Sequence, residues 1–273
     1  MKKQINAVIS TTTKKVDEVF LFTELMNNLN NNNASSCFVK SVHSNAGYID
    51  YFSTMTNSIK KIEIADLLII NHNTTKNETR ICFLQAKYKK NSYKSFLSFN
   101  GDALQWELLR TKPDVIDTYN NGFPSDILNF TKYQTITSYG IFYKDVLNQV
   151  DLLFTLPEHL APSKFQKRTT LKFNGTGNCP IHNCTKGVCP KETISICYLD
   201  GFENELYRGN IGAPLDMAKK KYVSRLLKTI HQNTENSFIL RFSELSGIEF
   251  NEFTESAPYI NTAILITNGK NNV

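Results

Sequence analysis

One acidic residue and one short polar motif stand out because they interrupt apolar segments. Asp66 lies inside the apolar run of residues 62–70, and Gln85 and Lys87 lie near the end of a second apolar run, residues 81–89. A carboxylate is costly to bury in apolar surroundings unless something compensates its charge. A bound cation or Lys87 would do so, and these residues therefore predict either a cation site or a structural ion pair.

Two predicted strands would position these side chains. Both apolar runs are rich in β-forming residues, and the ten polar residues between them, 71–80, predict a loop, so together they indicate a hairpin. Alternate residues of a strand share a face, which places Gln85 and Lys87 together, about 6–7 Å apart at their Cα atoms. By the same alternation within residues 62–70, Glu63 points to the face opposite Asp66.

The pattern formed by these residues resembles a known catalytic motif. Asp66, followed after a hairpin by Gln85-Ala86-Lys87, is similar to the Asp…(Asp/Glu)-x-Lys motif of the PD-(D/E)XK nuclease superfamily. The match is to the variant with glutamine at the second position, as in some restriction endonucleases and in nuclease effectors of bacterial anti-phage defence systems. The resemblance covers residues 14–110. It implies an α/β fold, with a restriction-endonuclease-like mixed central sheet flanked by helices.

The resemblance also implies an activity, a cofactor and partners. A Mg²⁺-dependent (or Mn²⁺-dependent) DNA endonuclease would hold the ion with the Asp66 carboxylate and the Gln85 carbonyl, and Lys87 would orient or polarise the attacking water. Members of the family often add an acid from the first helix, for which Glu18 and Glu24 are both candidates. DNA is the implied partner, with other subunits of a defence complex as further candidates. The alternative is a non-catalytic nucleic-acid-binding or protein-interaction subunit that retains the fold.

Lysines follow the motif, and the motif itself also has a purely structural interpretation. Lys89, Lys90 and Lys94 follow it closely and are candidates for contacts with backbone phosphates. In the simpler structural interpretation, Asp66 pairs with Lys87 across the hairpin, and Gln85 lies at an exposed edge.

A cysteine-rich segment forms a second candidate site. Cys179, His182, Cys184 and Cys189 fall within eleven residues, and Cys197 could replace His182. Thiolates and imidazole are the ligands that tetrahedral Zn²⁺ prefers, and four protein ligands would make that zinc structural. A surface loop with free thiols is the alternative.

Bulk composition is that of an ordinary globular protein. The chain has 273 residues, a formal charge of +6, and no run of the ~20 apolar residues that a membrane helix needs. We expect a cytoplasmic protein, with a nuclease core at residues 1–170. A Cys-rich insertion and an α/β elaboration packed on that core would occupy residues 171–273.

Hydrophobic periodicity predicts further elements. We expect helices at residues 14–29, 101–110 and 219–231, and the threonines at 11–13 would cap the first of them. We expect strands at residues 134–144, 238–242 and 263–267.

Overall fold

The computed structural model has a mixed α/β fold with a mixed central sheet, which confirms the coarse prediction from the sequence. The structure describes residues 1–32, 36–39, 47–89, 98–117, 124–131, 133–173, 196–216, 220, 223–224, 236–249 and 260–268.

Among the described residues, two N-terminal helices precede six consecutive strands, and the later helices separate groups of strands. The helices in the described residues are α1 Lys2–Thr11, α2 Glu18–Asn32, α3 Ala103–Thr111, α5 Leu199–Tyr207 and α7 Asn236–Ser246, with 3-10 helices η2 Gln134–Ile136 and η3 Pro157–His159. The strands in the same residues are β1 Ser36–Val39, β2 Tyr48–Ser53, β3 Ser58–Glu63, β4 Leu67–Asn73, β5 Glu78–Lys89, β6 Ser98–Gly101, β7 Val115–Asp117, β8 Thr137–Lys144, β9 Val150–Thr155, β10 Leu160–Pro162, β11 Thr169–Phe173, β12 Ile196–Tyr198, β13 Ala213–Pro214 and β14 Thr262–Thr267.

The main sheet has the order β1-β14-β4-β5-β8-β9-β12, with β13 paired to β5. Two of its pairings, β14 with β4 and β5 with β8, are parallel, and its other pairings are antiparallel. Because β5 lies between β4 and β8, both of its edges are hydrogen-bonded. The C-terminal strand β14 was predicted from its apolar run and lies inside this sheet.

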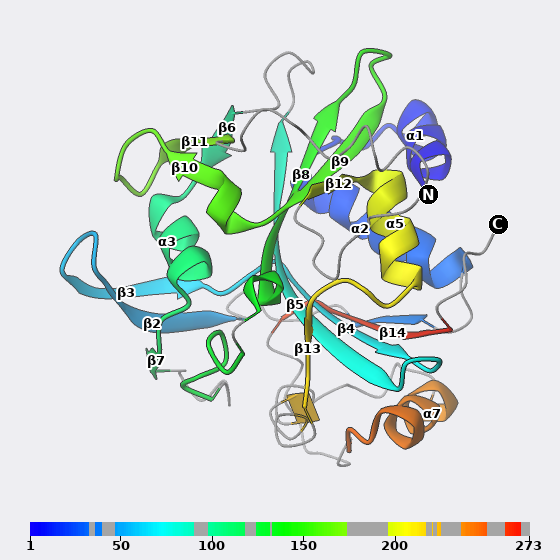
Figure 1. The fold of residues 1–273 in the computed structure, drawn as a ribbon. Coiled ribbons are helices and arrows are strands. Elements are labelled where there is room, and N and C mark those ends of the chain that lie inside the picture. The colour runs from blue at the N-terminus through cyan, green and yellow to red at the C-terminus, as the bar shows by residue number, and fades with distance from the viewer. Residues whose placement is uncertain are drawn as a thin grey trace.

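Helices cover both faces of the main sheet (Figure 1). Apolar side chains of α1, α2 and α5 pack with Leu67, Ile69 and Leu84 on one face. On the other face, α3 and α7 contribute Leu108 and Phe242 to a core that contains Ile81 and Phe83. Two smaller sheets, β3-β2-β7 and β10-β11-β6, lie on either side of α3 (Figure 1).

The predicted strand 62–70 is in fact two strands in different sheets. β3 ends at Glu63 and β4 begins at Leu67, so the chain leaves one sheet and enters another within three residues. The apolar residues Ile64 and Ala65 are buried at this crossing, which is why the sequence looks continuous. The strict alternation that separated Glu63 from Asp66 does not apply across the break.

The polar segment 71–80 was predicted as a loop, and this prediction was wrong. β4 extends to Asn73 and β5 begins at Glu78, which leaves only residues 74–77 as the turn. The side chains of Asn71 and Asn73 are buried, and backbone groups distant in the sequence satisfy their hydrogen bonds. Asn71 Nδ2 donates to the Leu206 carbonyl at 2.6 Å, and Asn73 Nδ2 donates to the Arg208 carbonyl at 2.6 Å.

The segment 238–242 forms part of helix α7, and its prediction as a strand was wrong. Phe238 and Phe242 are four residues apart and both buried, which is helical spacing. The first predicted helix, 14–29, is displaced toward the C-terminus and is observed as Glu18–Asn32. α2 begins at Glu18, and the Asp17 side chain accepts from Phe20 N at 3.1 Å, so Asp17 rather than a threonine caps it.

The predicted helix 101–110 is confirmed as α3. Asp102 caps it, accepting from Leu104 N at 2.8 Å. Most of the predicted helix 219–231 lies outside the described residues, and no helix within the described ranges is long and apolar enough to span a membrane.

Candidate active site

Three separate elements bring polar side chains together at the point where β4 begins. Asp66 directly precedes β4, Gln85 and Lys87 lie on the interior strand β5, and Glu18 opens α2. Gln85 is only 2% exposed. The structural interpretation that put this glutamine at an exposed edge was therefore wrong, because β8 pairs with the far side of β5.

Asp66 is held in place by β5. Its Oδ2 atom accepts from the backbone N–H of Ala86 at 2.7 Å and from Gln85 Nε2. Its own N–H donates to the Leu84 carbonyl at 3.1 Å, which fixes the backbone at the entrance to β4. Burial raises the pKa of the Asp66 carboxyl, and Lys87 and the Ala86 N–H partly offset that rise.

Lys87 pairs with Glu18 and not with Asp66. Lys87 Nζ lies 3.3 Å from Glu18 Oε1, and the backbone N–H of Tyr88 donates to Glu18 Oε2 at 3.1 Å. Burial raises the pKa of Glu18, and Lys87 opposes that rise. The structure therefore has an ion pair between Lys87 and Glu18 of α2 in place of the Asp66–Lys87 pair expected in the structural interpretation.

Of the two acids proposed from the first helix, the structure brings Glu18 to the site. Glu24 accepts instead from Asn27 Nδ2 at 3.5 Å, on its own helix. It lies six residues further along α2, or about 9 Å at 1.5 Å per residue. The start of α2, and not its middle, therefore meets β5, and Glu24 as a metal ligand stays a prediction.

Glu63 also belongs to this group of charges, contrary to the prediction from strand alternation. Burial raises its pKa to about 7, with repulsion from Asp66 and Glu18 adding to the rise and Lys87 opposing it. The break between β3 and β4 removes the alternation that would have turned Glu63 away. Its position three residues before Asp66 was the only signal in the sequence.

Gln105 is a further member of the site that the sequence did not single out. From the first turn of α3, its Nε2 donates to Gln85 Oε1 and to the Glu63 carbonyl, the latter at 3.2 Å. Gln85 thus turns its nitrogen toward Asp66 and its oxygen toward Gln105. The Gln85 oxygen can become a metal ligand beside Asp66 only if the side-chain amide of Gln85 rotates by half a turn. The Gln85 nitrogen would then donate a hydrogen bond to the side-chain oxygen of Gln105.

No protein-family model, curated protein or solved structure matches this chain. The resemblance to the PD-(D/E)XK nucleases therefore rests on the sequence motif alone.

The donor set suits a hard divalent cation. With Glu18, Glu63 and Asp66 ionised and Lys87 protonated, the site carries three negative charges and one positive, a net charge of −2. Among the described residues, no three His, Cys, Asp or Glu side chains converge as metal ligands. Mg²⁺ does not need such a cage, because it retains waters and binds through one or two carboxylates together with substrate phosphates.

The remaining predicted ligands have different positions. Lys89 Nζ donates to the Ser98 carbonyl, and this hydrogen bond joins β5 to β6. Lys90 and Lys94 lie outside the described residues. So do Cys179, His182, Cys184 and Cys189, and structural zinc there stays a prediction.

The raised pKa of Glu63 predicts how stability depends on pH. Because the folded state holds this proton to about pH 7, and the unfolded carboxyl releases it near 4.5, the free energy of unfolding should fall between these pH values. Glu63→Gln should reduce this fall, to which Glu18 and Asp66 also contribute because burial raises their pKa values. The variant should be about 1–2 kcal/mol more stable than wild type at pH 8, since partial exposure screens part of the effect.

Urea unfolding at pH 5 and pH 8 measures this difference. The matched control is Glu244→Gln, which replaces an exposed acid on α7. If the difference in unfolding free energy between Glu63→Gln and wild type is the same at pH 5 and pH 8, Glu63 does not interact with the charges of the site.

Proposed function

We propose that this protein is a Mg²⁺-dependent (or Mn²⁺-dependent) DNA endonuclease with a PD-(D/E)XK active site in a restriction-endonuclease-like core that carries a Cys-rich insertion. The observation that carries the proposal is the convergence of Glu18, Asp66, Gln85 and Lys87 from a helix and two adjacent strands. A structural ion pair would need only two of them. A role in restriction or anti-phage defence, with partner subunits, is proposed on the resemblance.

In this proposal Asp66 and the Gln85 carbonyl hold the cation, and Glu18 adds a second carboxylate. The cation supplies charge stabilisation at the phosphate and a water of lowered pKa. Both hydrogen bonds that the described residues donate to the Asp66 carboxylate go to Oδ2, and none of these residues occupies Oδ1, the atom proposed to bind the cation. Burial raises the pKa of Glu63, and the excess negative charge of the site, which adds to that rise, favours binding of a cation over an empty site.

Lys87 provides the positive charge on the substrate side. Its ammonium group is held by Glu18 at 3.3 Å and lines the adjacent cavity. From there it can donate to the attacking water and to a phosphate oxygen. The attacking water loses one proton to solvent and its oxygen forms the new bond to phosphorus, while the bond to the leaving oxygen breaks and a proton from solvent neutralises that oxygen.

Cleavage of duplex DNA in the presence and absence of metal tests the proposal. We expect cutting with Mg²⁺ or Mn²⁺ and none in excess chelator. Cutting that continues unchanged in chelator would exclude the metal mechanism. DNA binding without cutting under all metal conditions would favour a non-catalytic subunit that keeps the fold.

Replacement of Gln85 should shift the dependence on metal concentration. Gln85→Glu adds a negative charge next to Asp66 at a position that is 2% exposed, so the metal-free protein should melt at a lower temperature. Divalent affinity should rise, and cutting should reach half its maximum at a lower Mg²⁺ concentration. Gln85→Ala removes an oxygen ligand and should lower activity at least tenfold, with partial rescue by Mn²⁺.

Mg²⁺ titrations of cleavage for wild type, Gln85→Glu and Gln85→Ala provide the measurement. Three superimposable curves would remove Gln85 from the site and end the motif assignment.

A further inference from the structure

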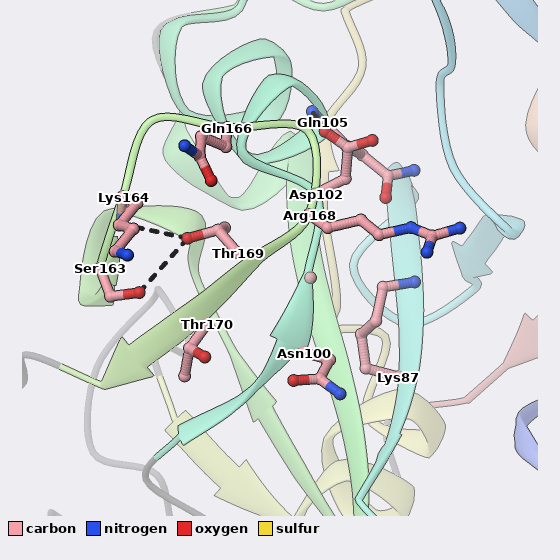
Figure 2. Close-up of a pocket in the computed structure, with 11 residues that line it drawn as sticks. Lys87, Asn100, Asp102, Gln105, Ser163, Lys164, Gln166, Arg168, Thr169 and Thr170 are labelled. Carbon is pink, nitrogen blue, oxygen red and sulfur yellow. Dashed lines mark hydrogen bonds between the residues drawn. The ribbon is translucent and has the colours of Figure 1, made fainter.

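A cavity of about 800 Å³ opens beside Lys87 (Figure 2). Its walls come from β5, from β6 and the first turn of α3, and from the loop that joins β10 to β11, residues 163–168. We call this segment the 163–168 loop. Gln105, which contacts the Gln85 amide, also lines the cavity. A substrate that reaches Lys87 through this cavity therefore lies against the 163–168 loop.

The cavity is positively charged. Its lining contains Lys87, Lys164 and Arg168 against one carboxylate, Asp102, so three positive charges and one negative give a net charge of +2. The Asp102 carboxylate already caps α3. In Figure 2 the charged ends of Lys87 and Arg168 extend toward the same part of the cavity. A polyanion fits this lining better than a neutral ligand.

The cations of the loop are available to an external partner. Lys164, Lys167 and Arg168 are all exposed. Within the described part of the chain, none of the three forms an ion pair with a carboxylate. A guanidinium group and two ammonium groups in one short loop offer three separate cations, which suits a chain of phosphates better than a single small anion.

The base of the loop is fixed to the scaffold. Ser163 N donates to the Thr170 carbonyl at 2.8 Å, and Lys164 N donates to Thr169 Oγ1 at 3.2 Å. β11 then pairs with β6, which brings Thr169 opposite Gly101 at the start of α3. The loop is thus held at a constant position relative to Lys87, as a binding element next to a reacting phosphate has to be.

An aromatic side chain lies between the cations. Phe165 is 68% exposed, the most exposed phenylalanine among the described residues. An exposed phenylalanine ring flanked by basic residues is the combination with which proteins stack on the bases of unpaired strands. Because stacking needs the face of a base, this feature favours a strand with an unpaired base over a fully paired duplex.

We propose that the 163–168 loop is the nucleic-acid-binding element of this site: Lys164, Lys167 and Arg168 bind backbone phosphates beside the cut, and Phe165 stacks on an unpaired base. The proposal rests on the proposed nuclease function and extends it to a substrate class, DNA with an unpaired segment such as a gap, flap or overhang.

Fluorescence anisotropy in excess chelator measures binding apart from cleavage. The probes are a labelled duplex and the same duplex with a short single-stranded gap. Wild type should bind the gapped probe more tightly. The combined variant Lys164→Gln, Lys167→Gln, Arg168→Gln should bind both probes at least tenfold more weakly. The slope of log affinity against log salt concentration should be smaller in magnitude by about 2–3 for this variant.

Phe165→Ala should weaken binding of the gapped probe by about five- to a hundredfold and leave duplex affinity within about twofold. The charge control is Lys3→Gln, Lys61→Gln, Lys76→Gln, three exposed lysines outside the cavity lining. The aromatic control is Phe52→Ala, at a phenylalanine that is 46% exposed on β2. Both controls should bind like wild type, and the loop variants should melt like them.

The outcomes separate this inference from the nuclease proposal. Loop variants that bind both probes as the controls do would overturn the inference, as expected if the loop contacts a protein, while metal-dependent cutting would stand. Wild-type protein that binds neither probe would overturn it too. Loss of binding in the loop variants, together with cutting that persists in chelator, would support the inference and exclude the metal mechanism.

Discussion

Replacing Lys87 by methionine should reduce DNA cleavage at least a hundredfold while DNA affinity changes by less than about threefold. Methionine keeps an unbranched apolar side chain and removes only the ammonium group. Phosphate contacts made elsewhere should therefore hold the DNA. The substitution also removes the ion pair with Glu18, whose two side chains are partly exposed, Lys87 to 17% and Glu18 to 35%. The free energy of unfolding should therefore fall by no more than about 1 kcal/mol.

Single-turnover cleavage and anisotropy on the same preparation provide the measurement. Lys172→Met is the matched control, because Lys172 is an exposed strand lysine on β11 that does not line the cavity. A Lys87→Met protein that cuts at the rate of this control would show that Lys87 has no part in the chemistry.

Asp66→Asn should abolish metal-dependent cutting without destabilising the fold. The amide oxygen of asparagine can still accept from the Ala86 N–H, which Asp66 does at 2.7 Å. What disappears is a buried charge near Glu18 and Glu63. The metal-free variant should therefore be as stable as wild type at pH 8 or up to about 1 kcal/mol more stable, as is common when functional residues are replaced. It should also lose the rise in melting temperature that Mg²⁺ gives wild type.

A purely structural Asp66 predicts the opposite result. Removing one partner of a buried pair costs about 3–5 kcal/mol, so Asp66→Asn would then melt far below wild type, and Mg²⁺ would have the same effect on both proteins. Thermal melts with and without Mg²⁺ at pH 8, run beside the cleavage assay, separate the two roles. A large loss of stability with an unchanged response to Mg²⁺ would show that Asp66 is structural.

The sequence determined those parts of the site whose geometry is local. Gln85 and Lys87 share a face of β5 because alternation within one strand depends only on the two-residue period. Helix α3 was predicted because its cap, Asp102, and its apolar residues are close in sequence. Strand β14 was predicted from a short run of β-forming residues, but the similar run 238–242 lies in helix α7, so such a run does not by itself decide between strand and helix.

Tertiary structure decided which residues complete the site. Both Glu18 and Glu24 lie on α2, and only the docking of its first turn against β5 selects Glu18. Glu63 joins because β3 and β4 belong to different sheets, and Gln105 joins because α3 folds back over β5. β4 continues through buried Asn71 because the Leu206 carbonyl accepts its side-chain amide, across 135 positions of sequence. No local pattern carries these contacts, since each depends on a partner that is distant in the chain and is brought close only by folding.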